Sequence, residues 1–278
     1  MTPPFVSTPL PERALIGMVH VAALPGSPAH TTSVEIIAGQ AADEARVLVQ
    51  AGFDAIIIEN MHDAPYVHDD EHGPHTVAAM TRIALELEAD VGEIRPVPVG
   101  VQILSGGNKH ALAVAQSTGG SFIRAENLVF AHVADEGLLA RAEGGSLLRY
   151  RKSIDATDVA IFADVKKKHA SHAITADLSL EEAAEATLFF GADGLVVTGA
   201  ATGKPTDPAD VERVKNVVNA SGREAPVLVG SGVTDQSARG LLEHADALIV
   251  GSFIKQAGHW ANPVDPNRAA ALVQAARG

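Results

Sequence analysis

The sequence has 278 residues, 46% of them hydrophobic, with no cysteine and a formal net charge of −13. The lack of cysteine excludes disulfides, thiolate metal sites and a cysteine nucleophile, and the acidic balance argues against nucleic acid as a partner, because phosphate backbones need clustered Lys and Arg. No apolar stretch is long enough to span a bilayer and the N-terminus lacks a signal-peptide core, so we expect a cytoplasmic protein with no membrane span.

Short apolar runs recur along the chain and predict its strands. Most are continuous rather than alternating, which is typical of parallel strands covered on both faces. In chain order, the expected strands are Leu15–His20, Ala55–Glu59, Val97–Leu104, Ser121–Arg124, Val159–Val165, Gly194–Thr198, Pro226–Gly230 and Ala247–Val250.

Helical patterns fill the gaps between these runs. Ser33 caps a predicted helix that ends at Gly52. Ser179 begins a capping box, and Asp207 and Asp265 each precede a proline at the first helical position. The sequence therefore predicts alternating strands and helices.

An aspartate recurs where a helix leads into a strand, at Asp54, Asp193 and Asp246. A repeated joint suits a repeated βα unit. Eight units in one chain, with the glycine-rich turns last rather than first, favour a single-domain (β/α)₈ TIM barrel over a doubly wound open sheet. We expect residues 1–12 to form a tail and residues 13–278 to form the barrel.

Gly/Ser turns follow the last two predicted strands. Glycines let backbone N–H groups approach an anion, and the loops after strands 7 and 8 of such barrels often bind phosphate. The expected phosphate site comprises Gly230, Ser231, Gly232, Gly251 and Ser252.

Polar residues stand at the carboxyl ends of all the predicted strands, where barrel enzymes carry their chemistry. Each has a simpler explanation. His20 could be a core histidine, and Glu59 and Asp164 could each form a salt bridge to Arg124 or a lysine. For Asp164, that lysine could be Lys166, two residues on. Their concentration at one end favours a site. The polar residues at or just beyond these strand ends also include Gln102, Ser105, Asn108, Glu126, Asn127 and Lys166. The candidate site residues, in chain order, are His20, Glu59, Asn60, Asp63, Arg124, Asp164, Lys168, His169, Thr198 and Gly199.

The loop after the second strand, residues 60–75, is rich in His, Asp and Glu. Such a cluster could bind a divalent metal, but its spacing matches no fixed metal motif. We interpret its outer part, Val67–His75, as a solvated lid, and Asp63 as the better site candidate.

The chain resembles the BtpA/SgcQ family from about Ala14 to Val273. The segments that carry the resemblance are Gly17–His20, Leu24–Pro28, Glu59–Tyr66, Phe122–Arg124, Leu147–Arg151, Phe162–Val165, Lys168–Ala170, Val197–Gly199, Thr202–Gly203, Val229–Val233, Val250–Ser252 and Trp260–Asp265. The resemblance implies a ribulose-phosphate-binding type of barrel. The family name comes from a member linked to photosystem I biogenesis. This chain departs from the usual pattern at Ala125-Glu126 and at Lys166-Lys167.

Two hypotheses follow. The first is an enzyme that acts on a small phosphorylated sugar or phosphoribosyl compound, as an isomerase, epimerase, aldolase or lyase. In this hypothesis Glu59 or Asp164 acts as the base, and His20 or His169 acts as the acid. Arg124 and Lys168 stabilise developing negative charge. The substrate is bound by Asn60, Asp63, Thr198, Gly199 and the glycine turns.

The enzyme hypothesis has variants. Lys166 or Lys168 could form a Schiff base, and Glu59, Asp164 and His169 could hold Mg²⁺, Mn²⁺ or Zn²⁺. We expect Glu59→Gln or Asp164→Asn to abolish turnover and leave folding intact. The second hypothesis is a non-catalytic assembly or stability factor for a membrane complex such as photosystem I. Under either hypothesis the protein could be a homo-oligomer.

Overall fold

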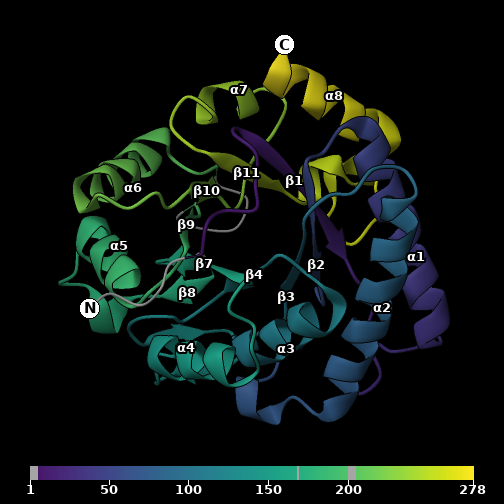
Figure 1. The fold of residues 1–278 in the computed structure, drawn as a ribbon, viewed down its shortest axis with the longest axis horizontal. Helices are drawn as coiled ribbons and strands as arrows, with labels where there is room; N and C mark the ends of the chain where they lie inside the picture. The colour runs from purple at the N-terminus through teal and green to yellow at the C-terminus, as the bar shows by residue number, and fades with distance from the viewer. Residues whose placement is uncertain (1–5, 168, 200–204) are drawn as a thin grey trace.

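Parallel strands close into a barrel in the order β1-β11-β10-β9-β7-β4-β3-β2 (Figure 1). The computed structural model describes residues 6–167, 169–199 and 205–278. The barrel confirms the predicted fold, and every predicted strand is present. The strands are β1 (Ala14–His20), β2 (Ala55–Glu59), β3 (Val99–Gln102), β4 (Phe122–Ala125), β7 (Ala160–Val165), β9 (Gly194–Val197), β10 (Val227–Val229) and β11 (Ala247–Val250).

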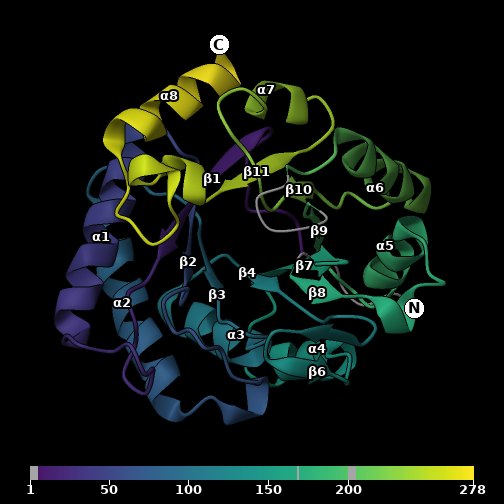
Figure 2. The same cartoon turned by 180° about the vertical axis from the view of Figure 1, so that it is seen from behind.

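Helices surround the barrel (Figures 1 and 2). The expected caps are present: Ser33 and Asp207 accept from backbone N–H groups, Gly52 ends its helix at φ 104°, and Ser179 forms its capping box with Glu182. None of the described helices is long and apolar enough to cross a membrane. The helices are α1 (Val34–Ala51), α2 (Pro74–Gly92), α3 (Asn108–Thr118), α4 (Gly144–Ser153), α5 (Leu180–Phe189), α6 (Pro208–Ser221), α7 (Ala238–Leu241) and α8 (Pro266–Arg277), with 3₁₀ turns η1 (Asp69–Glu71), η2 (Ala173–Thr175), η3 (Ser252–Ile254) and η4 (Gln256–Gly258).

The strands separate two hydrophobic cores. One fills the barrel lumen and includes Ile16, Met18 and Ile57. The other lies between strands and helices and includes Ile56 and Ile58. Successive residues of a strand therefore face opposite sides, as pleated strands require, and the lumen side of each strand can be followed residue by residue to its carboxyl end.

The N-terminal end of the barrel is closed by the chain itself. Leu10, from the predicted tail, packs in the lumen core, and the N–H of Val6 donates to Asp193 Oδ1 at 2.9 Å. The three joint aspartates share one function: each carboxylate accepts from a backbone N–H near the start of the neighbouring strand that precedes it in the chain. The bonds are Leu15 N to Asp54 at 2.8 Å, Ile161 N to Asp193 at 2.9 Å and Val227 N to Asp246 at 2.7 Å.

A small antiparallel sheet was not predicted. It comprises β5 (His132–Ala134), β6 (Gly137–Leu139) and β8 (Ala170–Ser171), in the order β6-β5-β8. Because β5 and β6 follow β4 while β8 follows β7, this sheet joins the loops at the carboxyl ends of two neighbouring barrel strands.

Candidate active site

The lumen side of the strands ends in a ring of polar side chains and glycines. His20 pairs in register with Glu59, and Glu59 with Gln102. Each lies two residues beyond a lumen-facing position of its own strand, so the alternation brings them to the same end of the lumen. The ring, in chain order, is His20, Glu59, Gln102, Arg124, Asp164, Thr198, Gly230 and Gly251.

Arg124 and Asp164 form a buried bidentate ion pair. Arg124 Nη2 is 2.9 Å from Asp164 Oδ1, and its Nε is 3.2 Å from Oδ2. Burial raises the pKa of the Asp164 carboxyl, and the guanidinium acts in the opposite direction. Gly230 makes room for this pair, because a Cβ there would lie 3.0 Å from Arg124 Nη2.

Lys166 does not pair with Asp164. Its Nζ donates to the carbonyl of Leu178, and its backbone has φ 48°, so the alternation that would bring it beside Asp164 stops there. Asp164 therefore has the simpler role considered for it, as the partner of Arg124 rather than of Lys166. Because Arg124 engages both carboxylate oxygens, Asp164 could accept a proton only by giving up part of this pair.

His20 and Glu59 form the second pair of the ring. His20 Nδ1 is 2.7 Å from the carbonyl of Trp260, and Nε2 is 3.7 Å from Glu59 Oε2. A carbonyl oxygen only accepts, so Nδ1 carries a hydrogen and Nε2 is the atom that can gain and lose a proton. A Cβ at Gly251 would lie 3.3 Å from that Nε2, so the imidazole borders the last glycine turn.

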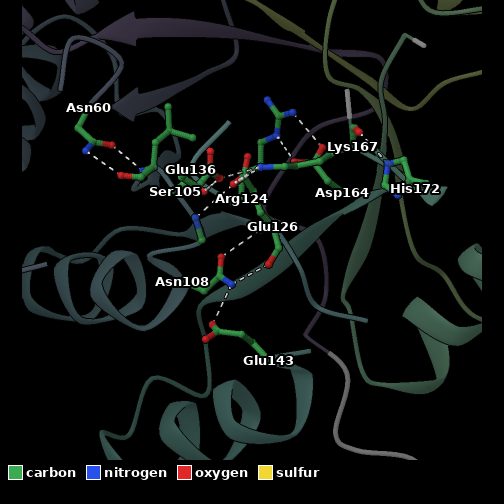
Figure 3. A network of polar contacts seen from close by, with 12 residues as sticks. Asn60, Ser105, Asn108, Arg124, Glu126, Glu136, Glu143, Asp164, Lys167 and His172 are labelled. Atoms are coloured by element: carbon green, nitrogen blue, oxygen red, sulfur yellow. Dashed lines mark hydrogen bonds and ion pairs between the residues drawn. The ribbon is translucent and has the colours of Figure 1, made fainter. Parts of the chain in front are cut away.

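A network centred on Lys167 extends the site towards the small sheet (Figure 3). Lys167 Nζ is 2.9 Å from Glu126 Oε2 and 3.8 Å from Glu136 Oε1, and Ser105 Oγ donates to Glu136. Asn108 Nδ2 donates to the Glu126 carbonyl at 2.7 Å. Burial disfavours the charge on Lys167, but Glu126 outweighs it and raises the pKa of the ammonium group. The sequence showed Ser105, Asn108 and Glu126 just beyond the ends of predicted strands, but none of the network residues was assigned a role.

Asn60 and Asp63 hold loops together. Asn60 Oδ1 accepts from Leu104 N at 2.7 Å, and its Nδ2 donates to Asp63 Oδ2 at 2.9 Å. Asp63 Oδ1 accepts from Leu24 N at 2.7 Å. These bonds tie together the segments that follow β1, β2 and β3.

The three proposed metal ligands do not form a metal site. Among the described residues, no group of three His, Asp or Glu side chains is arranged to hold a metal ion. Both oxygens of Asp164 already face a guanidinium, and His169 is exposed, whereas Glu59 is buried. The arrangement does not fit a cation at Glu59, Asp164 and His169, and Lys168 lies outside the described residues.

The turns predicted to bind phosphate differ in the hydrogen bonds that their backbone N–H groups make. Gly230 N donates to the Val197 carbonyl at 2.8 Å, so this N–H belongs to the sheet. Gly199 N donates to Ser231 Oγ at 3.1 Å. Gly232 has φ 71°, which favours glycine, and Gly251 precedes the 3₁₀ turn η3. Among the described residues, the N–H groups of Ser231, Gly232, Gly251 and Ser252 have no hydrogen-bond partner, so these are the groups that we expect a phosphate to use.

His132, on β5, should make the free energy of unfolding depend on pH. Burial, together with the nearby Lys167 ammonium, lowers its pKa from 6.5 to about 4. The unfolded chain therefore binds more protons between these values, so the free energy of unfolding should fall as pH drops from about 6.5 to 4, by about 3 kcal/mol for this group. Urea unfolding of the wild type and of His132→Phe across this range should give a shallower loss for the variant. Parallel curves would contradict the prediction.

Comparison with known proteins adds relatives that span the chain. The BtpA family model matches residues 11–278. A mitochondrial protein of Caenorhabditis elegans is 43% identical over 255 residues, 91% of this chain and 89% of that protein. The photosystem I biogenesis protein BtpA of Synechocystis is 35% identical over 262 residues, 94% of this chain and 87% of that protein.

Solved structures share the barrel at lower identity. Tryptophan synthase from Mycobacterium tuberculosis has a TM-score of 0.59 at 18% identity, over 96% of this chain and 93% of that one. Orotidine 5′-phosphate decarboxylase from Pyrococcus horikoshii has a TM-score of 0.55 at 14% identity, over 95% of this chain and 99% of that one. Similarity at this level shows a common fold and does not define a reaction.

Proposed function

This chain belongs to the BtpA family, and we propose that it is an enzyme acting on a small phosphorylated sugar or phosphoribosyl compound by acid–base chemistry. The observation that carries the proposal is the position of the His20–Glu59 pair beside Gly251, the first residue of the last glycine turn. A proton donor and acceptor next to an anion-binding turn suit a substrate that carries a phosphate close to its reacting carbon.

In the proposed reaction the phosphate lies on the N–H groups of Gly232, Gly251 and Ser252. Glu59 takes a proton from carbon or oxygen, and His20 exchanges a proton through Nε2 with the oxygen that develops charge. Arg124, held by Asp164, stabilises that negative charge. Such steps are those of isomerases, epimerases and lyases.

A Schiff base is less well supported. Imine formation needs a lysine with a lowered pKa, and Lys167, the lysine in the polar network, has a raised one. Lys166 Nζ donates to a backbone carbonyl instead of facing the lumen ring. Lys168, the other candidate, lies outside the described residues, and neither Lys166 nor Lys167 supports an imine, so we favour proton transfer without a covalent intermediate.

Phosphate binding is tested by thermal unfolding with inorganic phosphate and with sugar phosphates. A ligand at about 100 times its dissociation constant should stabilise the wild type by roughly 2.7 kcal/mol, and Gly232→Val should lose that stabilisation because its side chain would cover the turn. Gly222→Val is the matched control: Gly222 has φ 70°, close to the φ 71° of Gly232, but it ends α6 away from the turn. Equal stabilisation of wild type and Gly232→Val would contradict the phosphate site.

A second candidate function is assembly of a membrane complex, which the name of the Synechocystis relative favours. An assembly factor has no need for a buried His–Glu pair next to a glycine turn. If no phosphate compound stabilises the wild type, this second function becomes the better proposal.

A further inference from the structure

Gln102 is a buried polar residue of the ring that the proposed chemistry does not use. It ends β3 and lies beside Glu59 in register. The lumen side of β3 is identified by Gly100, where a Cβ would lie 2.1 Å from Phe122 of the lumen core. Gln102 follows two residues later, on the same side.

The amide oxygen of Gln102 lacks a donor. The residue is 2% exposed, and Oε1 has no hydrogen-bond partner among the residues that the structure describes. A buried carbonyl without a donor is costly, and native proteins keep few of them unless a ligand or water satisfies them. Because this amide oxygen lies in the ring of polar side chains, it points to a hydrogen-bond donor supplied by a bound molecule.

Gln102 stands across the barrel from the glycine turn after β10, and two strands, β2 and β1, separate β3 from β11. In the strand order, three strands separate β3 from β10 in either direction, namely β4, β7 and β9 on one side and β2, β1 and β11 on the other. A substrate whose phosphate lies on the turns after β10 and β11 would therefore present its other end to Gln102.

We propose that Gln102 Oε1 accepts a hydrogen bond from a hydroxyl at the end of the substrate that is distant from its phosphate. This inference rests on the proposed function and narrows its substrate class to phosphate esters of a polyol chain. A second phosphate or a carboxylate at that end would bring only acceptors to Oε1, whereas a hydroxyl brings the missing donor.

The test compares Gln102→Met with the wild type by calorimetric titration of inorganic phosphate and D-ribose 5-phosphate. Methionine keeps the length of the side chain and removes the amide. We expect phosphate affinity to be unchanged and D-ribose 5-phosphate affinity to fall about tenfold, which corresponds to one hydrogen bond of about 1.4 kcal/mol. Gln116→Met, at an exposed position of α3, is the matched control and should change neither affinity.

Unfolding of the protein without ligand gives a second readout. Because Oε1 has no partner to lose, Gln102→Met should unfold at the wild-type temperature or above it. A clearly lower unfolding temperature would show a structural role for the amide and overturn the inference.

The outcomes separate the two proposals. Phosphate binding with equal affinities of wild type and Gln102→Met for D-ribose 5-phosphate would overturn the role of Gln102 and leave the phosphate site standing. Failure of the wild type to bind either phosphate compound would overturn the proposed function. In that case, tenfold weaker binding of free D-ribose by Gln102→Met would still support the hydroxyl contact, and equal or absent binding would overturn it as well.

Discussion

Replacing Asp164 by asparagine is expected to lower the free energy of unfolding by about 3 kcal/mol, because it removes the counter-charge of a buried guanidinium. Asp164 holds Arg124 with two hydrogen bonds, and both side chains are almost fully buried. We place the effect at the lower end of the range for broken buried pairs because Glu59 and Glu126 also act on the Arg124 charge. The expectation from sequence that Asp164→Asn leaves folding intact is thus revised.

Equilibrium unfolding in urea measures this effect, and Arg213–Glu181 provides the matched control. That pair is also bidentate, with distances of 2.6 and 2.7 Å, but it is exposed. Glu181→Gln should therefore change stability far less than Asp164→Asn. Adding Arg124→Met to Asp164→Asn should restore part of the lost stability by removing the uncompensated charge. If Asp164→Asn unfolds like the wild type, the pair has no structural role.

The barrel could be predicted because strands buried on both faces leave a clear trace in sequence. Ile56, Ile57 and Ile58 are all buried, although they face two different cores. The same property explains why β3 was predicted too long. Ile103 and Leu104 are buried beyond its end, and the backbone of Leu104 bonds to the Asn60 side chain instead of a neighbouring strand. Apolar character reports burial, not strand pairing.

The membership of the ring followed from sequence, but the pairing within it did not. Strand ends place Arg124 and Asp164 on the lumen side, whereas their contact depends on the register of β4 against β7. Strand alternation predicts that Lys167 faces away from the lumen. The positive φ of Lys166, the residue before it, breaks this alternation and could not be read from the sequence. The small sheet escaped prediction since its strands have three, three and two residues, too few to show a period.

Two departures from the family pattern prove to be connected. One departure is Ala125-Glu126, directly after Arg124, and the other is Lys166-Lys167. The side chains of Glu126 and Lys167 meet in a buried ion pair at 2.9 Å. Glu126 is the nearest counter-charge of Lys167, so the two departures change the charge of the site together.

Replacing Glu59 by glutamine is expected to reduce turnover about 10² to 10⁴-fold, the usual contribution of a positioned base. Glutamine keeps the size of the side chain and removes the charge that faces His20 Nε2. Stability should stay within about 1 kcal/mol of the wild type, because the loss of attraction to His20 and Arg124 is offset by a smaller desolvation cost. The measurement is steady-state kinetics on the sugar phosphate that stabilises the wild type, together with urea unfolding.

The two carboxylates of the ring thus have opposite expected phenotypes. Asp164→Asn should lose stability through Arg124, while Glu59→Gln should keep stability and sugar-phosphate binding and lose turnover. His20→Gln should resemble Glu59→Gln, because it removes the imidazole that exchanges a proton with the reacting oxygen, whereas Glu59→Gln removes the carboxylate that takes the proton. If Glu59→Gln and His20→Gln both retained full turnover, proton transfer at this pair would be excluded, and the Lys167 network beside the small sheet would become the place to look for the chemistry.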